Sequence, residues 1–220
     1  MPRVRQRAYH FLLAIAAGGA AVHDVETHRF ENGLVLHVAA GHPAPVVAVQ
    51  AWVGVGSADE APPQAGVAHA VEHMLFKAAG VGELSRAIEG SGGEVNAWTS
   101  FDHTVYHAVL GGDDADAAIE ALGDALVAPR VEPDELARER QVILEEIRQG
   151  GDDPARSVAQ SLFATAFVSH PYRRPVIGTA DSVARLGERE LVEFFRSYYV
   201  ADNTTLVVAG DVDPARVRRS

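Results

Sequence analysis

Gly66-Val-Ala-His-Ala-Val-Glu-His-Met-Leu-Phe-Lys77 is the stretch of this 220-residue chain from which both a fold and a site can be predicted. Its centre has the order H-x-x-E-H, formed by His69, Glu72 and His73. Residues four apart share a helix face, so the two histidines can direct ring nitrogens at one ion. Glu72 would project beside that ion. Neutral nitrogen ligands, an open position for water and a carboxylate that takes the water's proton are the requirements of hydrolytic zinc chemistry.

The neighbouring residues favour a buried helix for this motif. Apolar side chains recur at helical spacing at Val67, Ala70, Val71, Met74 and Leu75. Unpaired polar groups are costly to bury, so two histidines and a glutamate on such a helix need a purpose. The alternative is a surface helix that carries the histidines by accident.

A zinc site needs a third protein ligand, and the segment 133–149 offers candidates. It has the pattern of an amphipathic helix. Glu139 and Glu146 are two turns apart on one face, whereas Glu145 points about 100° away. One glutamate of the pair can bind metal while the other orients a ligand from behind. Spacing alone does not choose between Glu145 and Glu146, and a solvated helix face is the alternative for any one of them.

The remaining pattern predicts an α+β fold, with one mixed, largely antiparallel sheet and helices packed against it. We expect a loop at 168–180. Strands are expected at 33–39, 45–56, 94–100, 103–110 and 204–209, and helices at 82–90, 113–127, 133–149, 155–167 and 188–198.

A second histidine pair, His103 and His107, also has a spacing of four. It lies in a segment with strand character, where the rings would be about 13 Å apart along one face. That is too far for one ion, so we expect these histidines to be structural or exposed.

Composition excludes some classes of protein. The net charge of −11 argues against a nucleic-acid partner. The chain has no cysteine, which rules out disulfides and thiolate metal sites. No later segment resembles a membrane-spanning helix.

Residues 1–24 differ in character from the rest. A basic start, Met1 to Arg7, precedes an apolar run from Phe11 to Val22 that is short for a membrane span. This pattern is typical of an export signal, which would place the protein in the periplasm. The alternative is an ordinary N-terminal helix or a disordered tail, on a cytoplasmic protein.

The chain resembles the pitrilysin-type inverzincin zinc peptidases, a family that includes insulin-degrading enzyme and the mitochondrial processing peptidase. The resemblance begins near residue 26 and follows the family's order. Its segments are Phe30–Leu36, Gly54–Glu60, Gly66–Lys77, Gly92–Tyr106, Glu139–Ile147, His170–Gly178 and Asn203–Asp211.

The resemblance implies a role for each matching position. His69, His73 and Glu146 would hold one Zn²⁺, Glu72 would be the general base, and Glu139 would support the ligands from behind. In the family, the strand that contains Asn96 and Ala97 pairs with an extended peptide substrate, a form of β-augmentation.

Family members usually enclose the peptide in a clamshell of homologous halves. Residues 25–220 would then be the metal-bearing half, cut short at its C-terminus, and would need a second homologous domain or subunit.

Two candidate functions follow from this resemblance. The first is a zinc-dependent endopeptidase that hydrolyses extended or unfolded peptides. The second is a catalytically inactive assembly or scaffold subunit of a two-chain peptidase. The intact motif favours the first, and the missing half favours the second.

Overall fold

A computed structural model describes residues 24–77, Ser85, 88–127 and 131–220. Two sequence predictions therefore fall mainly outside the described residues. One is the N-terminal signal or tail over 1–24. The other is the short helix over 82–90, of which only Ser85 and residues 88–90 are described, and these are helical.

Six strands form a single sheet in the order β1-β2-β6-β3-β5-β4. Neighbouring strands are antiparallel except for β2 and β6, which are parallel. This confirms the mixed, largely antiparallel sheet expected from the sequence. The strands are β1 (Val25–Arg29), β2 (Val35–Ala40), β3 (Val46–Val53), β4 (Glu94–Thr99), β5 (Thr104–Gly111) and β6 (Thr204–Gly210).

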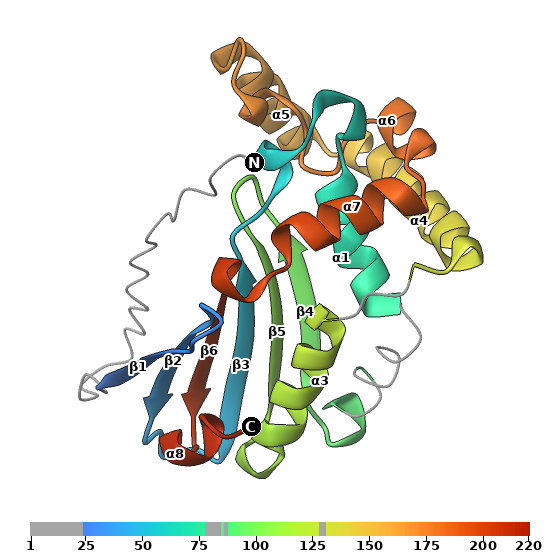
Figure 1. Ribbon diagram of the computed structural model, residues 1–220. Helices are drawn as coiled ribbons and strands as arrows, with labels where there is room; N and C mark the ends of the chain where they lie inside the picture. The colour runs from blue at the N-terminus through green and yellow to red at the C-terminus, as the bar shows by residue number, and fades with distance from the viewer. Residues whose placement is uncertain (1–23, 78–84, 86–87, 128–130) are drawn as a thin grey trace.

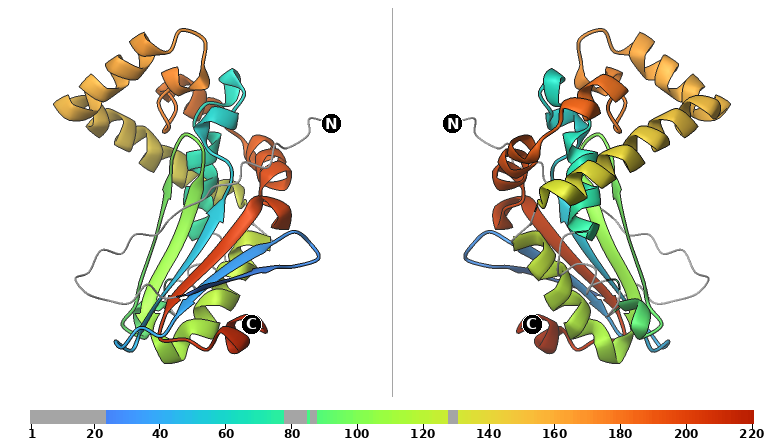
Figure 2. Two further views of the ribbon diagram at one scale, coloured as in Figure 1. Left: turned by 90° about the vertical axis from the view of Figure 1, so that its left-hand side faces the viewer. Right: turned by 90° about the vertical axis from the view of Figure 1, so that its right-hand side faces the viewer.

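Helices α1, α3 and α7 lie on the same side of the sheet, and α4 and α5 extend from one end of the molecule (Figures 1 and 2). None of the described helices combines the length and apolar character that crossing a membrane requires. The helices are α1 (Val67–Lys77), α3 (Ala115–Val127), α4 (Pro133–Asp152), α5 (Pro154–Ala166), α6 (Ala180–Arg185), α7 (Glu188–Tyr198) and α8 (Pro214–Val217).

The core lies between the sheet and these helices. Along β3 every second side chain, from Val47 to Val53, is buried against the helices. The opposite face of the sheet is more open, with Val46, Trp98 and Val109 exposed by 44%, 39% and 43%. The helix α1 is buried along most of its length, as its apolar pattern predicts.

Some elements were not expected from the sequence. The strand β1 has no buried residue, so it lacks the alternation of apolar and polar side chains that identifies strands. The six residues of α6 are too few to show a helical period, although Thr179 caps the helix by accepting a hydrogen bond from the Ser182 N–H. The loop expected at 168–180 contains a 3₁₀ turn, Pro171–Arg173, and ends with the cap and the first residue of α6, Thr179 and Ala180.

Candidate metal centre

Helix α1 brings His69 and His73 together. The two side chains lie one turn apart, and their ring centroids are 4.6 Å from each other. Each is largely buried, with 16% and 15% of the side chain exposed. The helix contacts β4 on one side and α4 and α7 on others, so its position is fixed by packing on several elements.

Helix α4 adds the third member of the cluster. The Glu146 oxygens lie 3.7 Å from Nε2 of His69 and 3.7 Å from Nε2 of His73. One potential ligand atom from each of the three residues lies within 4.8 Å of the others. Among the described residues this is the one such group of metal-binding side chains.

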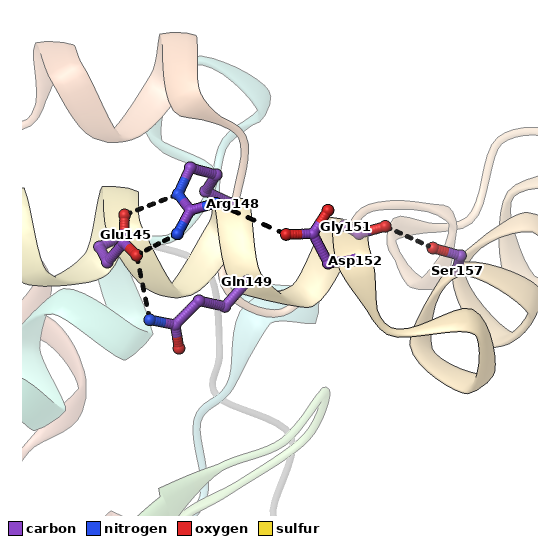
Figure 3. A network of polar contacts seen from close by, with 6 residues as sticks. All are labelled: Glu145, Arg148, Gln149, Gly151, Asp152 and Ser157. Carbon is purple, nitrogen blue, oxygen red and sulfur yellow. Dashed lines mark hydrogen bonds and ion pairs between the residues drawn. The ribbon is translucent and has the colours of Figure 1, made fainter.

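The neighbouring Glu145 is engaged elsewhere. Its carboxylate accepts hydrogen bonds from Arg148 and Gln149 on the exposed side of α4 (Figure 3). The hydrogen bonds from Arg148 and Gln149 lower the pKa of Glu145 to about 2. The structure therefore brings Glu146, and not Glu145, to the histidine pair.

The Glu139 carboxylate lies behind His73. Its Oε2 is 2.9 Å from Nδ1 of His73, and the residue is buried, with 5% of its surface exposed. A carboxylate at Nδ1 holds the proton on that nitrogen and leaves Nε2 as the acceptor. Nε2 is the atom that faces Glu146.

These residues fit a zinc ion. Zinc takes neutral imidazole nitrogens and carboxylate oxygens, and a catalytic site keeps three protein ligands. Burial, followed by the neighbouring His73, lowers the pKa of His69 to about 3, so this imidazole is neutral at physiological pH. The donor set of two imidazoles and one carboxylate is that of several hydrolytic zinc sites.

Glu72 lies on the same helix and contacts the edge strand. The Thr99 hydroxyl of β4 donates a hydrogen bond of 2.5 Å to its Oε2. Burial raises the pKa of Glu72, and the hydrogen bond from Thr99 opposes that rise. The buried hydroxyls of Tyr106 and Tyr199 are hydrogen-bonded to each other at 2.9 Å. Burial raises the pKa of both tyrosines, and the negative charge of Glu72 adds to that rise.

Asn96 and Ala97 lie on β4, the last strand in the sheet order. The Ala97 N–H donates to the Asn96 side chain, Oδ1, at 2.8 Å and not to β5. This amide therefore points to the free edge of the sheet, along which no other described strand pairs. The edge runs beside α1, which contacts β4.

His103 and His107 pack as side chains of the open sheet face. The ring of His103 lies 5.1 Å from that of Trp52, and the ring of His107 lies 5.3 Å from that of Trp98. Neither belongs to a group of potential metal ligands in the described part of the chain.

Three features of the site were not predicted from the sequence. The first is Thr99, to which the sequence assigns no role, although period-2 alternation places it on the same face as Ala97. The Tyr106–Tyr199 pair joins residues 93 positions apart, for which the sequence offers no signal. The third is a buried carboxylate, Glu60, at the start of α1.

Comparison with known proteins finds relatives that are named as zinc proteases and as a processing peptidase. A Mycobacterium leprae protein named as an uncharacterized zinc protease is 39% identical over 168 residues, covering 75% of this chain and 38% of the relative. The beta subunit of the mitochondrial-processing peptidase of Blastocladiella emersonii is 31% identical over 201 residues, covering 89% of this chain and 43% of the subunit.

The fold is also similar to that of a solved protease structure. The crystal structure of a Helicobacter pylori protease matches 90% of this chain with a TM-score of 0.85 and 30% identity. The match covers 49% of that protease, so the chain spans less than half the length of each of these three proteins. Residues 36–180 match the family described as Insulinase (Peptidase family M16). The chain therefore belongs to the M16 family of zinc peptidases, the family of pitrilysin and the mitochondrial processing peptidase.

Proposed function

We propose that this chain is the metal-bearing half of a zinc-dependent endopeptidase that hydrolyses extended or unfolded peptides. The observation that carries the proposal is the convergence of His69, His73 and Glu146, with Glu72 on the same helix as the two histidines. Its relatives include proteins named as zinc proteases.

In this proposal, Nε2 of His69, Nε2 of His73 and the Glu146 carboxylate hold one Zn²⁺. Glu139 keeps the His73 ring in the tautomer and orientation that expose Nε2. When bound, the ion supplies Lewis-acid polarisation of a peptide carbonyl and acidifies a water molecule.

Glu72 is the proposed general base. Burial raises its pKa from the ordinary value, which brings it nearer to the working pH and makes the carboxylate a better proton acceptor. It would take a proton from the attacking water at one oxygen while Thr99 holds Oε2. It would then release that proton to the amine of the departing peptide.

The edge strand β4 is the proposed place for the substrate. An extended peptide can add to a free sheet edge through main-chain hydrogen bonds, which require little side-chain recognition. The Ala97 N–H faces that edge, with the Asn96 side chain as its present acceptor. A peptide carbonyl would replace that acceptor, and Asn96 would be freed to hold the peptide.

A second homologous domain or subunit is the proposed partner. The chain covers 38–49% of the three relatives described above, so more than half of each of them lies outside the match. The exposed apolar side chains Val46, Trp98 and Val109 on the open sheet face are consistent with a covering partner.

The test is cleavage of an internally quenched, unstructured peptide library by the purified, zinc-loaded chain. Glu72→Gln is the control, because it should keep the metal and abolish turnover. Cleavage that is lost in the control and on chelation supports the peptidase. Cleavage by Glu72→Gln at the parental rate would refute the assignment of the base.

An inactive scaffold half is the second candidate, and the same experiment separates the two. If the chain binds one zinc ion but cleaves nothing, the homologous half is added. Activity on addition supports a two-part peptidase, and continued inactivity supports the scaffold.

A further inference from the structure

The two histidines of the cluster differ in how their rings are held. His73 has Glu139 at its Nδ1. The Nδ1 atom of His69 is buried and, within the described part of the chain, has no hydrogen-bond partner. The position of the His69 ring therefore depends on the backbone that carries it, which is the first turn of α1.

That first turn is held by a side chain distant from it in sequence. Glu60 accepts hydrogen bonds from the backbone N–H of Gly66 at Oε2 and of Ala68 at Oε1, each 2.9 Å long. The first N–H groups of a helix have no partner within the helix. A carboxylate satisfies them and interacts favourably with the helix dipole. Ala68 directly precedes His69, so this contact fixes the residue from which the ligand projects.

Glu60 is itself held in place by the loop after α5. The Arg174 guanidinium donates to the backbone carbonyls of Glu60, at 2.9 Å, and Ser57, at 3.3 Å. Gly66 has a φ of +94°, and a Cβ there would lie 2.7 Å from the Ile177 carbonyl oxygen. Two segments that resemble the family, Gly54–Glu60 and His170–Gly178, thus meet at the start of the motif helix.

A carboxylate at this place is costly to bury, and its hydrogen bonds with the two helix amides offset that cost. Glu60 has 4% of its surface exposed, and burial raises its pKa to about 7 although the two amides and Arg174 lower it. An ionisable group in such surroundings is expensive compared with an apolar side chain of similar size. The distinct property of a carboxylate is that its two oxygens can accept from two amides at once.

We propose that Glu60 is a positioning residue of the metal centre, which acts on His69 through the first turn of α1. Glu139 holds the His73 ring directly, through a hydrogen bond to its Nδ1. Glu60 would hold the backbone from which the His69 ring projects. This inference rests on the proposed zinc site and adds to it a residue that touches neither metal nor substrate.

The experiment measures metal binding in the full chain, with Co²⁺ as a spectroscopic probe for zinc. Glu60→Gln keeps the shape but presents an NH₂ group to one of the two amides. Glu60→Asp keeps the charge but shortens the side chain. Glu31→Gln, at an exposed position, is the matched control. The readouts are the Co²⁺ dissociation constant, from competition with a chelator, and the visible absorption spectrum of the bound ion.

We expect Glu60→Gln to raise the Co²⁺ dissociation constant about tenfold and to change the intensity of the visible bands. Glu60→Asp should have a smaller effect, and Glu31→Gln none. A merely structural role would lower the unfolding temperature and leave the spectrum of the folded protein unchanged. That result, or failure of both Glu60 variants to fold, would overturn the proposal. Failure of the parent chain to bind Co²⁺ would instead overturn the zinc site.

Discussion

The Thr99 hydroxyl donates a 2.5 Å hydrogen bond to Oε2 of Glu72, which joins the edge strand of the sheet to the helix of the motif. The proposed base is therefore attached to the same strand that would pair with the peptide. Movement of β4 relative to α1 would change the position of the base as well as that of the substrate.

Replacing Thr99 by Val removes this hydrogen bond and keeps the shape of the side chain. A hydrogen bond to a charged group contributes about 1.5–3 kcal/mol, so we expect kcat to fall about tenfold or more, with a smaller change in KM. The measurement is steady-state cleavage of a quenched peptide by the zinc-loaded chain, with the homologous half added if the chain alone does not cleave.

Two variants test whether the hydroxyl causes this effect. Thr99→Ser retains the donor and should restore most of the rate. Thr205→Val makes the same exchange on β6 and should leave the rate unchanged. Equal rates for Thr99→Val and the parent would show that Glu72 needs no such anchor.

Adjacent glutamates on α4 provide a matched pair for the third ligand. Glu146→Gln should raise the zinc dissociation constant by at least about 100-fold, because losing a ligand costs more than losing a group behind it. Glu145→Gln should leave zinc binding unchanged, since Glu145 is engaged by Arg148. Zinc content after dialysis and competition with a chelator measure both, and loss of zinc in Glu145→Gln alone would reverse the assignment.

The contact between Glu139 and His73 predicts a graded effect on affinity. Glu139→Leu removes the acceptor at Nδ1 of His73 and should raise the zinc dissociation constant roughly 10- to 100-fold. Glu139→Gln keeps an oxygen at that place and should stay closer to the parent. If Leu and Gln behave alike, the hydrogen bond does not orient the ring.

The buried His69 predicts how the stability of the metal-free chain depends on pH. Its folded-state pKa is about 3, whereas the ordinary value is 6.5. Between these values the unfolded chain binds a proton that the folded chain does not, so stability falls as the pH is lowered from 6.5 toward 3. The His69 contribution between pH 7 and pH 5 is about 2 kcal/mol.

Urea unfolding with a chelator present, at pH 7 and pH 5, measures this dependence. The variant His69→Asn should lose less stability on acidification than the parent, by about that amount. His42→Asn, on an exposed loop, should follow the parent. A parallel decline in the parent and in His69→Asn would contradict the prediction.

The sequence predicted the sheet and most of its helices because their residues alternate with clear periods of 2 and 3.6. The strand β3 and the helix α1 are examples, since each buries one regular set of side chains. The strand β1 was missed because all five of its residues are exposed. Alternation of apolar and polar residues arises where one face of a strand is buried, and neither face of β1 is buried.

The site could be predicted only in part. A spacing of four on one helix identified His69 and His73, because helix geometry alone brings such residues together. The choice of Glu146 over Glu145 depends on where each side chain finds a partner, and Arg148 engages Glu145. Glu60 reaches Gly66 and Ala68 across a loop, beyond the local patterns that identify helix caps.

The hydrogen bond from the Ala97 amide to the Asn96 side chain has a consequence for solubility. An unpaired sheet edge can recruit a strand from another copy of the protein as readily as it recruits a peptide, and such pairing leads to aggregation. Because the Ala97 amide already has an acceptor, pairing with a strand from another copy would be less favourable at this position. A transient peptide can still displace the side chain, so the edge would remain open to exchange while resisting permanent pairing.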